Sequence, residues 1–274
     1  MDGQGPAQEV KSVGSELPPR LREHNLTLVS AGVAFYAFLA LVPTLIAVVS
    51  IYGLVANPDD VRRQIDNVAG ALPEEIRTFL EYQLTEIVEA PRAGVSLTLV
   101  VAIALALWSA SGGMAALVTG LHVAHEEDEP KSFVAKRGKA LALTLGAVIV
   151  LGVVVWSLAF LPSFIEEVGL GDTGRLVFGI LRWPILAVVM VVALGLLYRL
   201  AVPGSRRLIT PGAIVGTAIW LAASVLFAFY TANFASYSKT YGALASIVIV
   251  LLWLFLSVLA ILIGAEVDAI REAS

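Results

Sequence analysis

The chain alternates long stretches that contain no Asp, Glu, Lys or Arg with short segments that hold nearly all of its charges. The uncharged stretches are residues 24–58, 93–125, 140–165, 183–198, 208–238 and 240–265. A helix needs about 20 residues, at a rise of about 1.5 Å each, to cross a hydrocarbon core about 30 Å thick. Five stretches exceed this length, and 183–198 reaches it when it is extended back to residue 176, across Arg182. The pattern therefore predicts six transmembrane helices.

The predicted fold is all-α, a polytopic membrane protein in which a polar cytoplasmic tail, 1–25, precedes one membrane domain, 26–270. The six spans are expected at about 27–56, 93–118, 140–161, 176–198, 212–234 and 243–265. Six spans place both termini on one side. If that side is the cytoplasm, 11 of the 18 Lys and Arg residues lie inside and 7 lie outside. The positive-inside rule favours this orientation.

The long segment between the first two predicted spans, 57–92, carries an apolar stripe. Its apolar residues recur at spacings of three and four, at Ile65, Val68, Leu72, Ile76, Leu80, Leu84 and Ile87. This spacing is typical of one helix face, and Pro73 followed by two acids is typical of a helix start. We expect one or two amphipathic helices on the outer face, packed on the bundle or lying among the headgroups.

Composition agrees with a membrane protein and excludes several other classes. Hydrophobic residues make up 58% of the chain and charged residues 15%, against about 25% charged in soluble domains. This profile excludes a disordered chain and a basic nucleic-acid-binding domain. The absence of cysteine excludes a disulfide framework and a zinc-thiolate site. Phosphate-binding glycine motifs are also missing from the sequence, which argues against ATP-driven work by this chain.

Pro43 interrupts the first predicted span. Proline removes a backbone hydrogen bond and clashes with the preceding turn, so we expect a kink near Leu39. The freed carbonyl needs a partner inside the protein, and Tyr36, Thr44 and Ser50 are candidates to supply or neighbour one. Both a packing kink and a discontinuous helix around a binding site are consistent with this pattern.

Arg182 is the one charge that falls well inside a predicted span. If the helix starts near Trp183, with Pro184 in its first turn, Arg182 lies at the outer interface beside a belt tryptophan. If the span starts at residue 176, Arg182 lies almost two turns deep and needs a partner. An unpaired deep arginine costs at least about 2.5 kcal/mol. Contact with an anion or headgroup and contact with a structural partner both remain open.

The connection between the last two predicted spans is rich in aromatic, amide and hydroxyl side chains around one cation. Its candidate contact residues are Asn233, Tyr237, Lys239, Tyr241 and Gly242. Tyrosines at an interface form the expected aromatic belt. The same set also suits recognition of a phosphate or sugar headgroup, and composition does not separate these interpretations.

Glu266 follows the last uncharged stretch. It lies 24 residues after Gly242, or roughly 36 Å along a helix, which places it at the inner interface. A plain boundary carboxylate is the favoured interpretation, and an ion or proton site facing the bundle is the alternative. His122 and His125 precede two acids, but no second cluster completes a metal site, so none is predicted.

Ordered motifs in several spans resemble those of the YihY/BrkB family. They are the run 30–43 from Ser30 to Pro43, Arg182-Trp183-Pro184, Tyr198 to Pro203, Asn233-Phe234, Ser236-Tyr237, Thr240 to Leu244, Leu251 to Leu254, and Gly264-Ala265-Glu266. The resemblance extends from about Leu26 to Asp268. One departure is His122, where the family often has Asn, and this weakens any role carried over to that position.

The resemblance implies a bacterial inner-membrane protein with six spans and an unsettled biochemical activity. Some members of that family are labelled virulence or serum-resistance factors, and some carry an old label as the tRNA-processing ribonuclease BN. The resemblance also implies functional roles for Arg182, for the turn 233–242 and for Glu266.

Three function classes follow, and the favoured one is a non-ATP-driven transporter or permease for an anionic lipid or solute. It rests on the polar set Arg182, Asn233, Tyr237, Lys239 and Glu266 and on the kinked first span. The second is an envelope scaffold, suggested by 57–92 and by the small-residue face 212–216. The third, a ribonuclease, lacks a paired metal-binding constellation. We expect no enzymatic activity, cofactor, metal or nucleic acid, with membrane lipids as partners and homo-oligomerisation left open.

Overall fold

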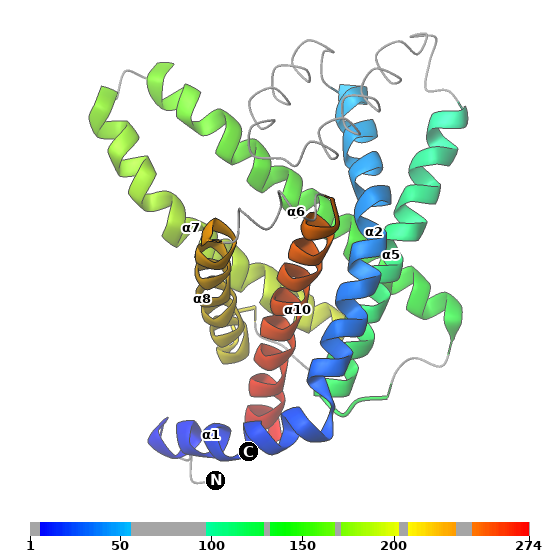
Figure 1. Ribbon diagram of the computed structural model, residues 1–274, viewed down its shortest axis with the longest axis vertical. Helices are drawn as coiled ribbons and strands as arrows, with labels where there is room; N and C mark the ends of the chain where they lie inside the picture. Colours follow the sequence, from blue (N-terminus) through cyan, green and yellow to red (C-terminus); the bar gives the residue numbers. More distant parts are fainter. Residues whose placement is uncertain are drawn as a thin grey trace.

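The computed structural model describes residues 6–55, 97–128, 132–167, 171–202, 208–233 and 243–273, and in these ranges every regular element is an α-helix (Figure 1). The helices are α1 (Pro6–Glu23), α2 (Leu26–Val55), α5 (Leu97–Ala124), α6 (Phe133–Glu167), α7 (Gly171–Ala201), α8 (Pro211–Asn233) and α10 (Ala243–Ala273). The all-α fold class is confirmed. The amphipathic segment expected at 57–92 lies outside the described residues.

Several helices have the length and apolarity needed to cross a membrane. Within the described residues, four segments meet both conditions, namely Ile103–Ala124, Pro184–Ala201, Pro211–Thr231 and Ile247–Ala273. A fifth is added if Ser12–Glu23 and Leu26–Leu41, which meet at an angle of 63°, form one bent span. This number, taken over the described part of the chain, is smaller than the six predicted.

The outside of the helix bundle is apolar. Leu28, Val225 and Phe229 are 73%, 70% and 72% exposed, and many other large apolar side chains share this outward position. Burying such a side chain is worth about 1.5–3 kcal/mol, so a surface of this kind is costly in water. Hydrocarbon solvates it without that cost, which agrees with helices that lie in a bilayer.

Helix α10 lies at the centre of the packing and contacts α1, α2, α5 and α8. Its crossing with α8 depends on three glycines: Gly212, Gly216 and Gly264. A Cβ atom added to Gly264 would lie 2.5 Å from the carbonyl oxygen of Gly212 and 2.6 Å from the hydroxyl of Tyr198. The small-residue face 212–216 therefore packs against α10 within the same chain, as small faces do in membrane helices.

The N-terminal region, which is predicted as a polar tail, forms a helix. Pro18 and Pro19 lie inside α1, which nevertheless continues to Glu23. Asn25 adopts a left-handed conformation, with φ of 48°, and the chain turns there into α2. Asparagine tolerates this conformation better than most residues. Figure 1 shows α1 (dark blue) lying across the end of the bundle where both termini are found.

The segment 126–139 carries charges of both signs, and its sequence predicts a solvated cytoplasmic connection. The loop is shorter than this prediction, because α6 begins at Phe133. Lys136, Arg137 and Lys139 are helical, which corrects the prediction of a solvated connection. Arg137 stacks over the Trp108 ring, 4.3 Å from its centroid, and donates to the Trp108 carbonyl. Lys139 donates from Nζ to the carbonyl of Ala201 at 2.5 Å. The carbonyls at a helix end lack helical partners, and Lys139 supplies one for α7.

Replacing Lys139 with methionine is expected to lower the stability by about 1.5 kcal/mol, because the Ala201 carbonyl loses a charged donor. Thermal unfolding of the detergent-solubilised protein measures this loss. Arg199→Met, which removes an exposed cation from α7, serves as the control and is expected to unfold as the wild type does. Equal melting temperatures for Lys139→Met and the wild type would contradict this role.

Candidate functional site

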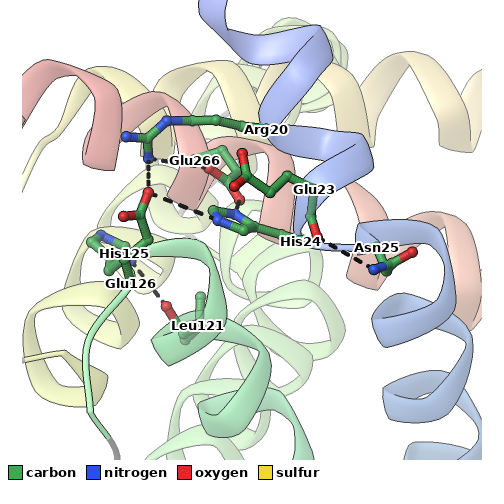
Figure 2. Close-up of polar contacts among 8 residues, drawn as sticks. All are labelled: Arg20, Glu23, His24, Asn25, Leu121, His125, Glu126 and Glu266. Atoms are coloured by element: carbon green, nitrogen blue, oxygen red, sulfur yellow. Dashed lines mark hydrogen bonds and ion pairs between the residues drawn. The ribbon is translucent and has the colours of Figure 1, made fainter.

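Ionisable side chains from three helices meet inside the end of the bundle at which α1 lies. The end of α1 contacts α10, and α10 contacts α5. Figure 2 shows His24 and Arg20 from the α1 end, Glu126 from the end of α5, and Glu266 from α10, all pointing toward one another. We call Arg20, His24, Glu126 and Glu266 the end cluster.

Glu266 is the buried centre of the end cluster, with 0% of its surface exposed. Its Oε1 atom accepts a hydrogen bond from His24 Nδ1 at 2.5 Å. Its Oε2 atom lies 3.8 Å from Arg20 Nη1. Because burial of an ionised carboxylate costs several kcal/mol, this group depends on the two bases for its place in the interior.

Glu126 lies at the solvent edge of the end cluster, where its side chain is 59% exposed. Its Oε1 atom lies 3.1 Å from Arg20 Nη1 and 3.8 Å from His24 Nε2. The same two bases therefore contact an exposed acid and a buried one. Two acids and two basic groups come together, so the cluster has balanced charges when His24 is protonated.

Two left-handed residues direct these side chains toward α10. Asn25 turns the chain immediately after His24, and Glu126, with φ of 54°, ends α5. The amide of Glu127 donates to the carbonyl of His122 at 3.0 Å, which closes the helix end in the manner of a left-handed cap. His24 and Glu126 thus owe their positions to the two turns beside them.

A second acid of α10, Asp268, is buried at 4% exposure next to the end cluster. Its Oδ1 atom accepts a hydrogen bond from the amide of Gly212 at 2.7 Å. Thr210 also caps α8, because its hydroxyl accepts from the amide of Ala213 at 3.0 Å. Asp268 therefore joins α10 to the start of α8, where a negative charge meets the positive end of the helix dipole.

Of the contact residues that the sequence singled out and whose side chains are described, Glu266 alone is found in this cluster. The structure does not leave it as a solvated boundary carboxylate, which was the favoured interpretation. Tyr36 lies on the outside of α2, where it is 53% exposed and packs edge-to-face on Phe35. Tyr36 is therefore part of the outer apolar surface.

The other predicted contact residues are placed by backbone alone or lie outside the described residues. Helix α2 continues through Pro43 to Val55, and the Pro43 side chain is not among those described. Helix α7 begins at Gly171 and includes Arg182, whereas the segment of α7 that is long and apolar enough to cross a membrane begins at Pro184, so both interpretations of Arg182 stay predictions. The Arg182 side chain is likewise not described, and neither is that of Asn233, the last residue of α8. The turn that holds Tyr237, Lys239, Tyr241 and Gly242 is outside the described ranges.

The sequence did not single out Arg20 and His24 as site residues, because both belong to the region predicted as a polar tail. The pair Pro18-Pro19 and the low hydropathy both argued against a helix there. Two signals were available: the amphipathic spacing of 6–23, and the position of His24 directly before a long uncharged stretch. In the described part of the chain, no three His, Cys, Asp or Glu residues are arranged to hold a metal ion.

Comparison with known proteins places all four residues of the end cluster within a family match. The model of the family described as "Virulence factor BrkB" matches residues 18–274, which is most of the chain. The chain is a member of the BrkB family. No solved structure matches it significantly.

Named BrkB-family relatives cover nearly the whole chain. The putative ribonuclease-like protein YfkH of Bacillus subtilis is 32% identical over 267 residues, which is 93% of each protein. UPF0761 membrane proteins of Photobacterium profundum and Vibrio campbellii are 26% and 30% identical, over 91% and 90% of this chain and 77% and 78% of their own. Two of these relatives are named membrane proteins, and the chain has apolar helices long enough to cross a membrane. The chain is therefore a membrane protein.

Proposed function

We propose that this BrkB-family protein is a non-ATP-driven transporter or permease for an anionic lipid or solute, with six spans in a bacterial inner membrane. Both termini face the cytoplasm in this proposal, because that orientation puts more Lys and Arg inside. The end cluster then lies at the cytoplasmic end of the bundle. Membrane lipids are the expected partners.

The buried carboxylate of Glu266 is the observation that carries this proposal. Ionisable groups inside a membrane bundle are expensive, and they commonly belong to ion or substrate pathways. Glu266 also connects three helices through His24 and Arg20, so α1, α5 and α10 cannot separate at this end while its contacts last. These contacts suit a gate that closes one end of a pathway.

The charges of the end cluster suit an anionic substrate. Arg20 contacts two carboxylates, and an incoming phosphate or carboxylate has the chemistry to replace one of them. Release of Glu266 from Arg20 would weaken the connection between α1 and α10. In this mechanism, the substrate and Glu266 compete for the guanidinium group of Arg20, and binding of the substrate opens the bundle end.

Flux measurements in proteoliposomes test the proposal. The wild-type protein is expected to accelerate movement of labelled phosphatidylglycerol or of a soluble organic anion. Glu266→Gln removes the charge that holds Arg20 in the closed contact, so it is expected to raise the rate by about tenfold or more, the effect of about 1.4 kcal/mol on a barrier. Glu272→Gln makes the same change at an exposed position of α10 and is expected to leave the rate unchanged. Absence of flux above empty liposomes for both substrates would overturn the proposal.

The described residues add no observation in favour of the scaffold or the ribonuclease. The 212–216 face is occupied by α10 within the chain, and segment 57–92 lies outside the described ranges. The word ribonuclease comes from the name of the Bacillus subtilis relative and is said of that protein. We therefore propose neither activity.

A further inference from the structure

A groove lies on the outside of the bundle where α1 turns into α2. It has a volume of about 600 Å³ and is lined by Leu21, Arg22, Asn25, Thr27, Leu28, Ala31 and Phe255. The lining is divided along its length. Its polar side chains, Arg22, Asn25 and Thr27, come from the end of α1, the turn and the start of α2, whereas α10 and the part of α2 beyond Thr27 contribute apolar side chains only; Leu21 adds an apolar side chain from α1. We call it the elbow groove.

The elbow groove extends from the charged end of the bundle into its apolar part. Phe255 precedes Glu266 by 11 residues on α10, which is roughly 16 Å along the helix. His24, which contacts Glu266, is two residues from Arg22. The groove thus offers a cation from the end of α1 and apolar side chains from α2 and α10.

The elbow groove opens on the side of α2 that faces away from the bundle. Leu28, Phe35 and Leu39 are 73%, 53% and 54% exposed, and their spacing of seven and four places them on one helix face. In a membrane protein, such an apolar face contacts lipid. Since Leu28 also lines the groove, the molecules next to the groove are those of the bilayer.

Arg22 provides the charge that selects among these molecules. Arg20, two residues earlier, is engaged by Glu126 and Glu266. Within the described residues, by contrast, no carboxylate forms an ion pair with Arg22. A guanidinium binds a phosphate with charge-assisted hydrogen bonds, and basic groups at a membrane surface attract anionic lipids.

We propose that the elbow groove binds one anionic phospholipid, whose phosphate contacts Arg22 and whose acyl chain lies along Leu28, Ala31 and Phe255. The groove and the end cluster lie on opposite sides of the same turn, as the positions of Asn25 and Glu266 show (Figure 2). A bound lipid therefore holds α1 in the position from which His24 reaches Glu266. This site requires that the helices lie in a bilayer, and it does not require that the protein transports anything.

Native mass spectrometry of the full-length protein in detergent, titrated with phosphatidylglycerol or phosphatidylcholine, tests the proposal. Arg22→Gln is expected to weaken phosphatidylglycerol binding about fivefold, the effect of about 1 kcal/mol per basic residue at an anionic surface. Ala31→Trp fills the apolar part and is expected to weaken binding about tenfold or more. The controls, Arg199→Gln and Ile214→Trp, change an exposed cation and an exposed apolar position outside the groove. Both are expected to bind as the wild type does.

Three results would overturn the proposal. Binding of phosphatidylglycerol by Arg22→Gln and Ala31→Trp at wild-type strength would show that the lipid sits elsewhere. If phosphatidylcholine binds as strongly as phosphatidylglycerol and Arg22→Gln does not weaken its binding, the groove does not select an anionic headgroup. Displacement of the lipid by millimolar glycerol phosphate alone would indicate a soluble phosphate ester as the ligand. Absence of flux from the wild-type protein, with lipid binding intact, would instead count against the transport proposal alone.

Discussion

Replacing His24 with leucine is expected to destabilise the protein by about 3 kcal/mol, because it leaves the buried carboxylate of Glu266 without its hydrogen-bond donor. We expect the lower end of the range for a broken buried pair, since Arg20 remains 3.8 Å from Glu266. Adding Glu266→Leu to His24→Leu is expected to restore most of the stability. Two apolar side chains leave no unpaired buried charge. Unfolding in mixed detergent micelles measures the two single variants, His24→Leu and Glu266→Leu, and the double variant.

This result distinguishes a paired buried acid from an ordinary polar contact. If the two substitutions are independent, the double variant will be less stable than either single variant, and the assigned pairing is then wrong. Glu272→Leu, at an exposed position of the same helix, controls for the change of a glutamate to leucine on α10. It is expected to change the stability little, because surface substitutions usually do.

Replacing Gly264 with leucine is expected to destabilise the protein by about 3 kcal/mol, the upper end of the usual cost of overpacking. The obstacles to a side chain are the Gly212 carbonyl and the Tyr198 hydroxyl, and the first of these is backbone. Tyr198 donates to the carbonyl of Ile261 at 2.6 Å, so displacement of its ring also breaks that bond. Helices α8 and α10 must therefore separate.

Gly146→Leu is the matched control for this prediction. No atom lies within 4 Å of the place where a Cβ would stand at Gly146, which is exposed on α6. Leucine has a better helix propensity than glycine by up to about 1 kcal/mol, so this variant is expected to be as stable as the wild type or more so. The same unfolding assay compares both. A Gly264→Leu variant as stable as Gly146→Leu would show that α8 and α10 do not cross this closely.

The transport and lipid-binding predictions depend on the same helix packing as the stability predictions, but they test what that packing does. The transport test asks whether the Glu266 charge is used, and the lipid test asks whether the elbow groove is occupied. The stability tests above ask whether the contacts exist at all. A Glu266 variant that keeps its stability and changes the flux would therefore separate a functional role of Glu266 from a structural one.

The order of residues along the chain was enough to predict every described helix except α1, and the apolar environment of those helices. Each uncharged stretch overlaps one long helix, from α2 to α10, because the absence of charge is a local property that only an apolar environment tolerates. It also located Glu266 after the last uncharged stretch, although α10 continues beyond it to Ala273. Whether the Glu266 side chain is exposed or buried depends on α1, a helix that lies far from Glu266 in the sequence.

Which groups meet depends on the packing of the helices. His24 and Glu266 are 242 residues apart in the chain, and no local pattern links them. The glycines at 212 and 216 could have packed against any small surface, and the chain brings Gly264 of α10 to them. Lys139 looked like part of a solvated loop until α7 ended beside it at Ala201. Burial and pairing are properties of the packed bundle. The packing of α1 against α10 buries Glu266 and pairs it with His24, and this is why Glu266 is a candidate gate residue.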